Sequence, residues 1–126
     1  MKNIFTLSLL VLTLGLTSCS KKIVGEWQIA KYQTSKPNEQ EITLNNIGTI
    51  HFKKDNTGDK NVNYTVFGLT KIDNLPFKWL ETNKYLTLIS EDSDFSKSWI
   101  IIEKDRKKIH LKSTTGAEIQ VLELRK

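Results

Sequence analysis

Apolar and polar residues alternate along almost the whole chain after residue 22, and this alternation constrains the fold more than any other feature. Trp27 and Ile29, for example, alternate with polar neighbours, and so do Ile109 and Leu111. A period of two is typical of a strand with one buried face, and no segment after residue 22 has a convincing helical period. The sequence therefore predicts an all-β protein.

The lengths of the connections indicate how the strands are arranged. Short connections at 54–60, 82–84 and 105–107 alternate with longer ones at 33–46, 68–76 and 91–97. In an up-and-down meander, alternate connections fall at the same end of the sheet. We therefore expect an eight-stranded antiparallel barrel with one mouth, which also leaves no exposed edge; a half-open sandwich is the alternative. The predicted strands are 25–32, 47–53, 61–67, 77–81, 85–90, 98–104, 108–113 and 118–124.

The last predicted strand breaks the alternation. Ile119 and Val121 are out of phase with Leu122 and Leu124. We expect either a bulge that re-aims the end of this strand or cover on both of its faces.

Cys19 is the only cysteine, and it follows an apolar run that extends from Ile4 to Leu16. A lysine near the start, an apolar run and small residues before a cleavage site form a secretory signal. Leu16-Thr17-Ser18-Cys19 resembles the lipobox of bacterial lipoproteins, which implies cleavage before Cys19 and a lipid on its thiol. The expected organisation is a signal peptide at 1–18, a lipidated tether at 19–24 and a barrel domain at 25–126.

Gly25 and Trp27 open the first strand, and Arg125 follows the last one. The Gly-x-Trp motif resembles that of lipocalins and related calycin barrels. The turn from Phe52 to Gly58 is similar to one in small bacterial lipocalin-like lipoproteins. The resemblance implies that Trp27 plugs the closed base of the barrel and that Arg125 packs across its ring. It also implies that the long 33–46 connection covers the mouth as a lid.

Two functions are compatible with such a barrel, and neither is catalytic. The first is binding of a small apolar ligand inside the barrel; its candidate contacts are Ile29, Ile50, Val66, Phe77, Leu88 and Trp99. The second is a protein-interaction module, an inhibitor or an accessory subunit of an envelope complex, with a barrel filled by its own side chains. Exposure of Phe67, Leu69 or Phe95 would favour the second function, because exposed apolar patches mark interfaces.

The sequence predicts no enzyme, cofactor or metal site. His51 and His110 are the only histidines, and both alternate with apolar residues. Each is therefore expected on the outside of a strand, away from a shared acid–base or metal site. A nucleophile elbow and a phosphate loop are also missing from the sequence.

Charge is unevenly distributed along the predicted barrel. The end with tight turns carries twelve Lys and Arg, including Lys21, Lys22 and Lys60, against seven Asp and Glu. Nucleic acid is a poor partner for an exported lipoprotein, so we expect this end to face an anionic membrane. By resemblance to lipoprotein sorting signals, Ser20 and the two lysines that follow favour the outer membrane, facing the periplasm.

Overall fold

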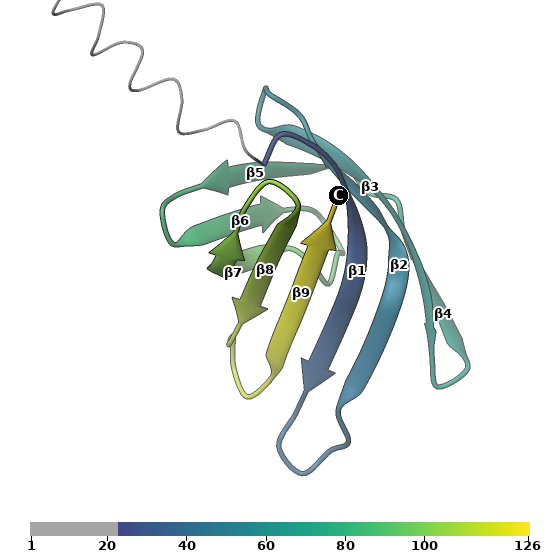
Figure 1. Ribbon diagram of the computed structural model, residues 1–126. Helices are drawn as coiled ribbons and strands as arrows, with labels where there is room; N and C mark the ends of the chain where they lie inside the picture. Colours follow the sequence, from purple (N-terminus) through teal and green to yellow (C-terminus); the bar gives the residue numbers. More distant parts are fainter. Residues whose placement is uncertain (1–22) are drawn as a thin grey trace, which may run out of the picture.

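The computed structural model describes residues 23–126, which form nine β-strands (Figure 1). The predicted signal peptide, Cys19 and most of the tether lie outside the described residues. Between residues 23 and 126, no helix is long and apolar enough to cross a membrane. The strands are β1 (Gly25–Ser35), β2 (Ile42–Phe52), β3 (Thr57–Val66), β4 (Leu69–Asp73), β5 (Phe77–Glu81), β6 (Tyr85–Ile89), β7 (Lys97–Lys104), β8 (Lys108–Ser113) and β9 (Ile119–Arg125).

Eight of these strands close into a barrel. The hydrogen-bonded order is β2-β1-β9-β8-β7-β6-β5-β3, and β3 pairs in turn with β2. Every pairing in this ring is antiparallel. The predicted all-β, eight-stranded antiparallel barrel is confirmed. All eight strands of this closed ring and the core that they enclose lie within the described residues 23–126.

The barrel has one end with tight turns and one with longer loops. We call the first end the base; it contains Ile23, the turns 53–56, 82–84 and 105–107, and Lys126. The other end is the mouth, where the connections 36–41, 67–68, 90–96 and 114–118 lie (Figure 1). The predicted asymmetry is present at three of the four mouth connections, whereas 67–68 is a two-residue turn because β4 occupies part of the loop expected there.

The long first connection predicted at 33–46 is much shorter in the structure. β1 runs on to Ser35 and β2 begins at Ile42, so only residues 36–41 connect them. The register shifts between Ile29 and Lys31, and Asn46 on the opposite strand has a positive φ of 54°. This bulge interrupts the period-two pattern, so the predicted strands 25–32 and 47–53 end close to it and leave out the parts of β1 and β2 nearest the mouth.

The strand β4 was not predicted, because 68–76 was expected to be a loop. β4 pairs only with the mouth-side half of β3, from Val62 opposite Asp73 to Val66 opposite Leu69. Four of its five residues are exposed, so no buried face imposes an alternation on the sequence. In Figure 1 the β3–β4 hairpin extends away from the neighbouring β2 strand toward the mouth.

Of the two alternatives expected for the last strand, the bulge is absent, because β9 pairs with β8 in one continuous register. Gln120, Leu122 and Leu124 are buried, whereas Ile119 is exposed and Val121 is half-buried. The apolar residues seemed out of phase because Gln120, a polar residue, occupies an inward position.

Aromatic side chains fill the barrel interior. Trp27, Trp99 and Phe52 are completely buried, and Phe52 packs edge-on against Trp79 with ring centroids 5.6 Å apart. Each buried indole needs a partner for its N–H. Trp27 donates to the Ile23 carbonyl at 2.8 Å, and Trp99 donates to the Phe95 carbonyl at 2.9 Å. The interior therefore has little room for a ligand below the mouth.

A buried lysine lies beside the shortest strand pairing of the barrel, that between β3 and β5. β3 and β5 pair through only two residues, Thr57 and Gly58. Beyond that point the fully buried Lys60 ammonium lies 2.5 Å from the Asp73 carboxylate and donates to the Leu75 carbonyl at 2.9 Å. Lys60 therefore does not belong to the basic surface of the base, contrary to expectation.

Candidate functional sites at the two ends of the barrel

The mouth contains a pocket of about 540 Å³. Its apolar wall comes from Ile42 and Leu44 on β2 and from the β3–β4 hairpin, where Val66, Phe67 and Leu69 face it. Beyond residue 62, β3 no longer pairs with β2, so the hairpin and the mouth-side part of β2 form two separate walls. The pocket can therefore receive an apolar body between two strand segments.

The floor of the mouth pocket is a hydrogen-bonded polar network. The Gln120 amide donates to the Tyr32 hydroxyl at 2.9 Å and to the Glu118 carboxylate at 3.2 Å. The Lys97 ammonium donates to the Gln120 carbonyl oxygen, and the Thr34 hydroxyl donates to Glu118. Because these groups come from β1, β7, β9 and the 114–118 connection, the network links elements on several sides of the mouth.

Burial changes the proton affinities of this floor. It raises the pKa of the Tyr32 hydroxyl, and the nearby Asp94 and Glu118 carboxylates raise it further. It lowers the pKa of the Lys97 ammonium, an effect that Glu118 and Asp94 oppose. An ammonium carries three donors, and Lys97 makes one hydrogen bond within residues 23–126. The remaining donors can bind an anionic or carbonyl group of a ligand.

A second cluster fastens the hairpin to the 90–96 loop. The Asp94 carboxylate accepts hydrogen bonds from the Tyr64 hydroxyl at 2.8 Å and from the Lys71 ammonium at 2.9 Å. Burial alone would raise the pKa of Asp94, but these two donors outweigh it and lower that pKa. Burial and the Asp94 carboxylate also raise the pKa of Tyr64. The hairpin is thereby held as one wall of the pocket.

The base is sealed around Trp27. The Lys126 ammonium lies 4.9 Å from the centre of the Trp27 ring, in a cation–π arrangement. Gly25 has a φ of +130°, and a Cβ there would come within 2.8 Å of the Lys126 nitrogen. Arg125, expected across the ring, is exposed and donates to the Glu123 carboxylate at 2.7 Å. The cation at this position is therefore Lys126, because the outward direction of Arg125 follows from the alternation of β9.

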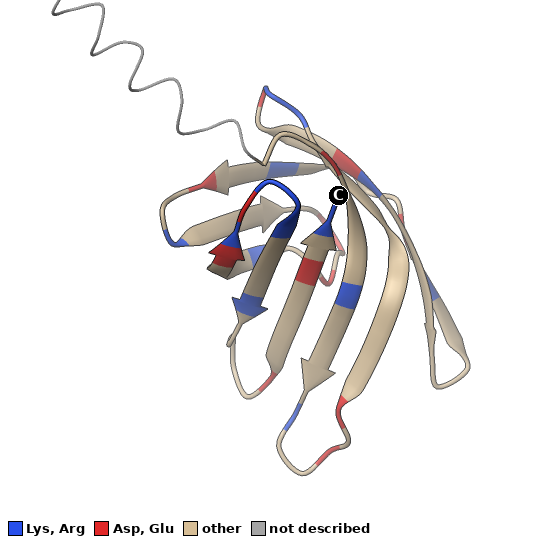
Figure 2. Ribbon diagram, viewed as in Figure 1, with Lys and Arg blue, Asp and Glu red and all other residues tan. Residues whose placement is uncertain are grey.

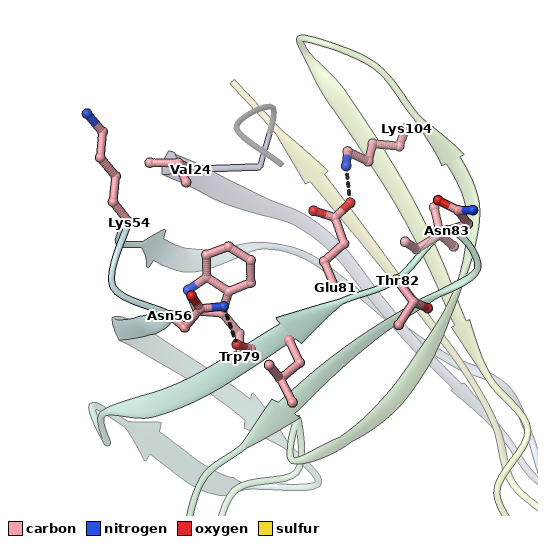
Figure 3. A pocket seen from close by; sticks show the side chains of 10 residues that line it. Val24, Lys54, Asn56, Trp79, Glu81, Thr82, Asn83 and Lys104 are labelled. Carbon is pink, nitrogen blue, oxygen red and sulfur yellow. Dashed lines mark hydrogen bonds and ion pairs between the residues drawn. The ribbon is translucent and has the colours of Figure 1, made fainter. Parts of the chain in front are cut away.

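A second hollow of about 500 Å³ opens at the base (Figure 3). Val24, Trp79 and Ile101 line its apolar part. On its rim, the Lys104 ammonium forms an ion pair with the Glu81 carboxylate, and both side chains are mostly buried. The Trp79 indole N–H is already bonded to the Thr57 carbonyl at 2.9 Å. The most buried charges of this hollow thus satisfy one another.

Comparisons with known proteins give the fold a name. A lipocalin-like protein from Bacteroides uniformis matches with a TM-score of 0.57 at 10% identity, over 83% of this chain and 98% of its own. The chain has a lipocalin-like fold. An uncharacterized protein from Bacteroides eggerthii matches with a TM-score of 0.54 at 12% identity, over 82% of this chain and 99% of its own. No protein-family model matches the sequence, and neither does any curated protein.

Within this lipocalin-like barrel, only one of the six candidate ligand contacts lies in the mouth pocket. That residue is Val66. The other five are buried in the packed core and do not line the mouth: Ile29, Ile50, Phe77, Leu88 and Trp99. Inward alternation identified the interior correctly but could not show at what depth its own side chains fill it.

The polar residues of the mouth were missed by sequence reasoning. Tyr32, Lys97 and Gln120 each occupy or flank an inward position, and Asp94 lies in the loop that precedes β7. One signal was present in the sequence: Gln120 interrupts the apolar residues of the last strand, where the alternation breaks. A polar residue at an inward position marks a buried network, because buried polar groups require partners.

Proposed function

We propose that this lipocalin-like barrel binds a small amphipathic ligand in its mouth pocket. The observation that carries the proposal is the pairing of an apolar wall with a polar floor in a pocket of about 540 Å³. The apolar part of a ligand would lie between Leu44 and Val66, and its polar head would meet Lys97. Binding rather than catalysis is favoured because the charged groups of the floor, Lys97 and Glu118, are both hydrogen-bonded to the Gln120 side chain and hold the network together.

Filling the pocket with a larger side chain tests the proposal. Val66→Trp should weaken binding of 1-anilinonaphthalene-8-sulfonate, which combines an apolar body with an anionic head, by about tenfold, since about 1.4 kcal/mol of contact would be lost. Val121→Trp makes the same change on the outer face of β9 and should leave the affinity unchanged. Fluorescence titration measures both. Equal affinities for Val66→Trp and the unaltered protein would contradict a site in the mouth.

We further propose that the barrel is anchored to the cell envelope by a lipid on Cys19, on the periplasmic side of the outer membrane. The support is the lipobox-like sequence and the short distance in the chain between Cys19 and β1. Mass spectrometry of the membrane-extracted protein should show loss of residues 1–18 and an acylated N-terminal cysteine. A free thiol on an uncleaved chain would contradict this anchoring.

A second function, recognition of a protein partner, has one specific observation in its favour. Phe67 is 88% exposed and Leu69 is 72% exposed at the tip of the β3–β4 hairpin. Phe67 also has a positive φ of 51°, which is unfavourable for a bulky residue. Phe95, the third residue named for this role, is buried against Tyr32 instead. The tip therefore combines strain with exposure, a combination that folding alone does not require.

A further inference from the structure

We propose that the base of the barrel docks on an anionic phospholipid surface, so that the mouth points away from the bilayer. The residues at the very end of the base are the turns 53–56, 82–84 and 105–107 and Lys126. Together they carry six Lys and Arg against two Asp. Figure 2 shows blue segments on all three turns and beside the C-terminus. Docking at the base is independent of ligand binding at the mouth.

The two acidic residues of these turns are engaged with the turn backbones. Asp55 accepts hydrogen bonds from the Thr57 amide at 3.1 Å and from the Thr57 hydroxyl at 2.6 Å. Asp105 accepts from the amides of Lys107 and Lys108, both at 2.9 Å. These hydrogen bonds lower the pKa of both carboxyl groups. Each acid therefore shapes its turn and leaves the neighbouring cations exposed.

Four of the six cations at the end of the base are exposed and have no carboxylate partner among the described residues, whereas Lys53 forms an ion pair with Asp59 at 3.3 Å. Within residues 23–126, no ion pair involves Lys54, Lys84, Arg106 or Lys107. By contrast, Lys104 and Lys108, set one step back from the end, are paired with Glu81 and Glu123. The outermost layer of the base is thus positive, and the layer behind it is closer to neutral. An anionic surface complements that outermost layer.

The chain enters the barrel at the same end. β1 begins at Gly25 on the base, and Lys21 and Lys22 precede it in the sequence. The lipid on Cys19 proposed above would be four residues from Ile23, a span of at most about 14 Å. The screening length at physiological ionic strength is about 8 Å. A tether this short would keep the base within reach of the headgroup charges.

Vesicle binding by the barrel without its lipid tests the proposal. Residues 20–126 should bind vesicles of phosphatidylglycerol and phosphatidylcholine in equal parts at low salt, and should be released at high salt. They should not bind vesicles of phosphatidylcholine alone. The triple change Lys84→Glu, Arg106→Glu and Lys107→Glu should weaken the partition coefficient by at least about tenfold, since each cation near an anionic leaflet contributes about fivefold.

A control variant with three charge reversals elsewhere distinguishes the effect of the base surface from the effect of the net charge. Lys31→Glu, Lys36→Glu and Lys112→Glu alter the overall charge equally but lie on β1, in the 36–41 connection at the mouth and on β8, away from the base. This variant should retain most of the binding. Circular dichroism checks the fold of each variant. Where a change to glutamate disturbs the fold, the same residue is changed to glutamine instead. Equal loss in both triples, or no binding of the unaltered barrel at low salt, would overturn docking through the base and leave an acidic protein as the partner to seek.

Discussion

The base and the mouth of the barrel each contain a tryptophan beneath a lysine, in different surroundings. At the base, Lys126 lies 4.9 Å from the Trp27 ring. Near the mouth, Lys97 lies 5.4 Å from the Trp99 ring. Both indoles donate to the carbonyl four residues earlier in the chain. The same local arrangement therefore closes one end of the barrel and supports the floor of a pocket at the other.

What differs between the two ends is the set of groups around the lysine. Lys126 follows β9 at the outer surface and lies over the buried Trp27 ring. Lys97 is half-buried, donates to Gln120 and faces the pocket. Of the two lysines, only Lys97 therefore has both polar neighbours and open space beside its ammonium group.

The largest expected effect comes from removing each tryptophan in turn. Trp27→Ala and Trp99→Ala should each lower the free energy of unfolding by about 3–5 kcal/mol, because both rings are fully buried. Only Trp99→Ala should also weaken dye binding by the folded protein, since the Lys97 position depends on that ring. Chemical denaturation and dye titration below the unfolding transition measure the two quantities. Equal effects of both changes on dye affinity would contradict a separate role for Trp99 beneath the mouth pocket.

The smallest expected effect has the opposite sign and concerns the hairpin at the mouth. Phe67 and Gly68 both have positive φ and join β3 to β4 as a two-residue turn. Asparagine is favoured over phenylalanine at the first of these positions, so Phe67→Asn should raise the free energy of unfolding by about 0.5–1 kcal/mol. A thermal melt measures the gain. A loss of stability would mean that the ring makes contacts that keep it in place.

The base was easier to predict from the sequence than the mouth. Trp27 and the tight turns are local signals: a glycine and a tryptophan at fixed spacing, and polar residues between alternating runs. The cation over the ring was assigned to the wrong neighbour, because Arg125 and Lys126 are adjacent and only the direction of β9 distinguishes them. The alternation that predicts strands also determines which of the two points outward.

The mouth depends on contacts between distant parts of the chain. Gln120 and Tyr32 meet through the pairing of β9 with β1, and Asp94 meets Tyr64 through a loop and a hairpin. A single sequence does not show such pairs. The sequence also does not show the depth of the pocket, because that depth depends on how completely the aromatic rings fill the interior. Five of the six candidate contacts therefore lie in the packed core below the mouth pocket.

The location of a bound ligand tests the central claim most directly. The three indole N–H groups and the Gln120 side-chain amide give resolved nitrogen–proton NMR signals at known depths. Titration of the labelled barrel with 1-anilinonaphthalene-8-sulfonate should shift the signals of Gln120 and of the Trp99 indole. The Trp79 signal in the base hollow and the Trp27 signal should remain in place. Shifts confined to Trp79 would put the site at the base and contradict binding in the mouth.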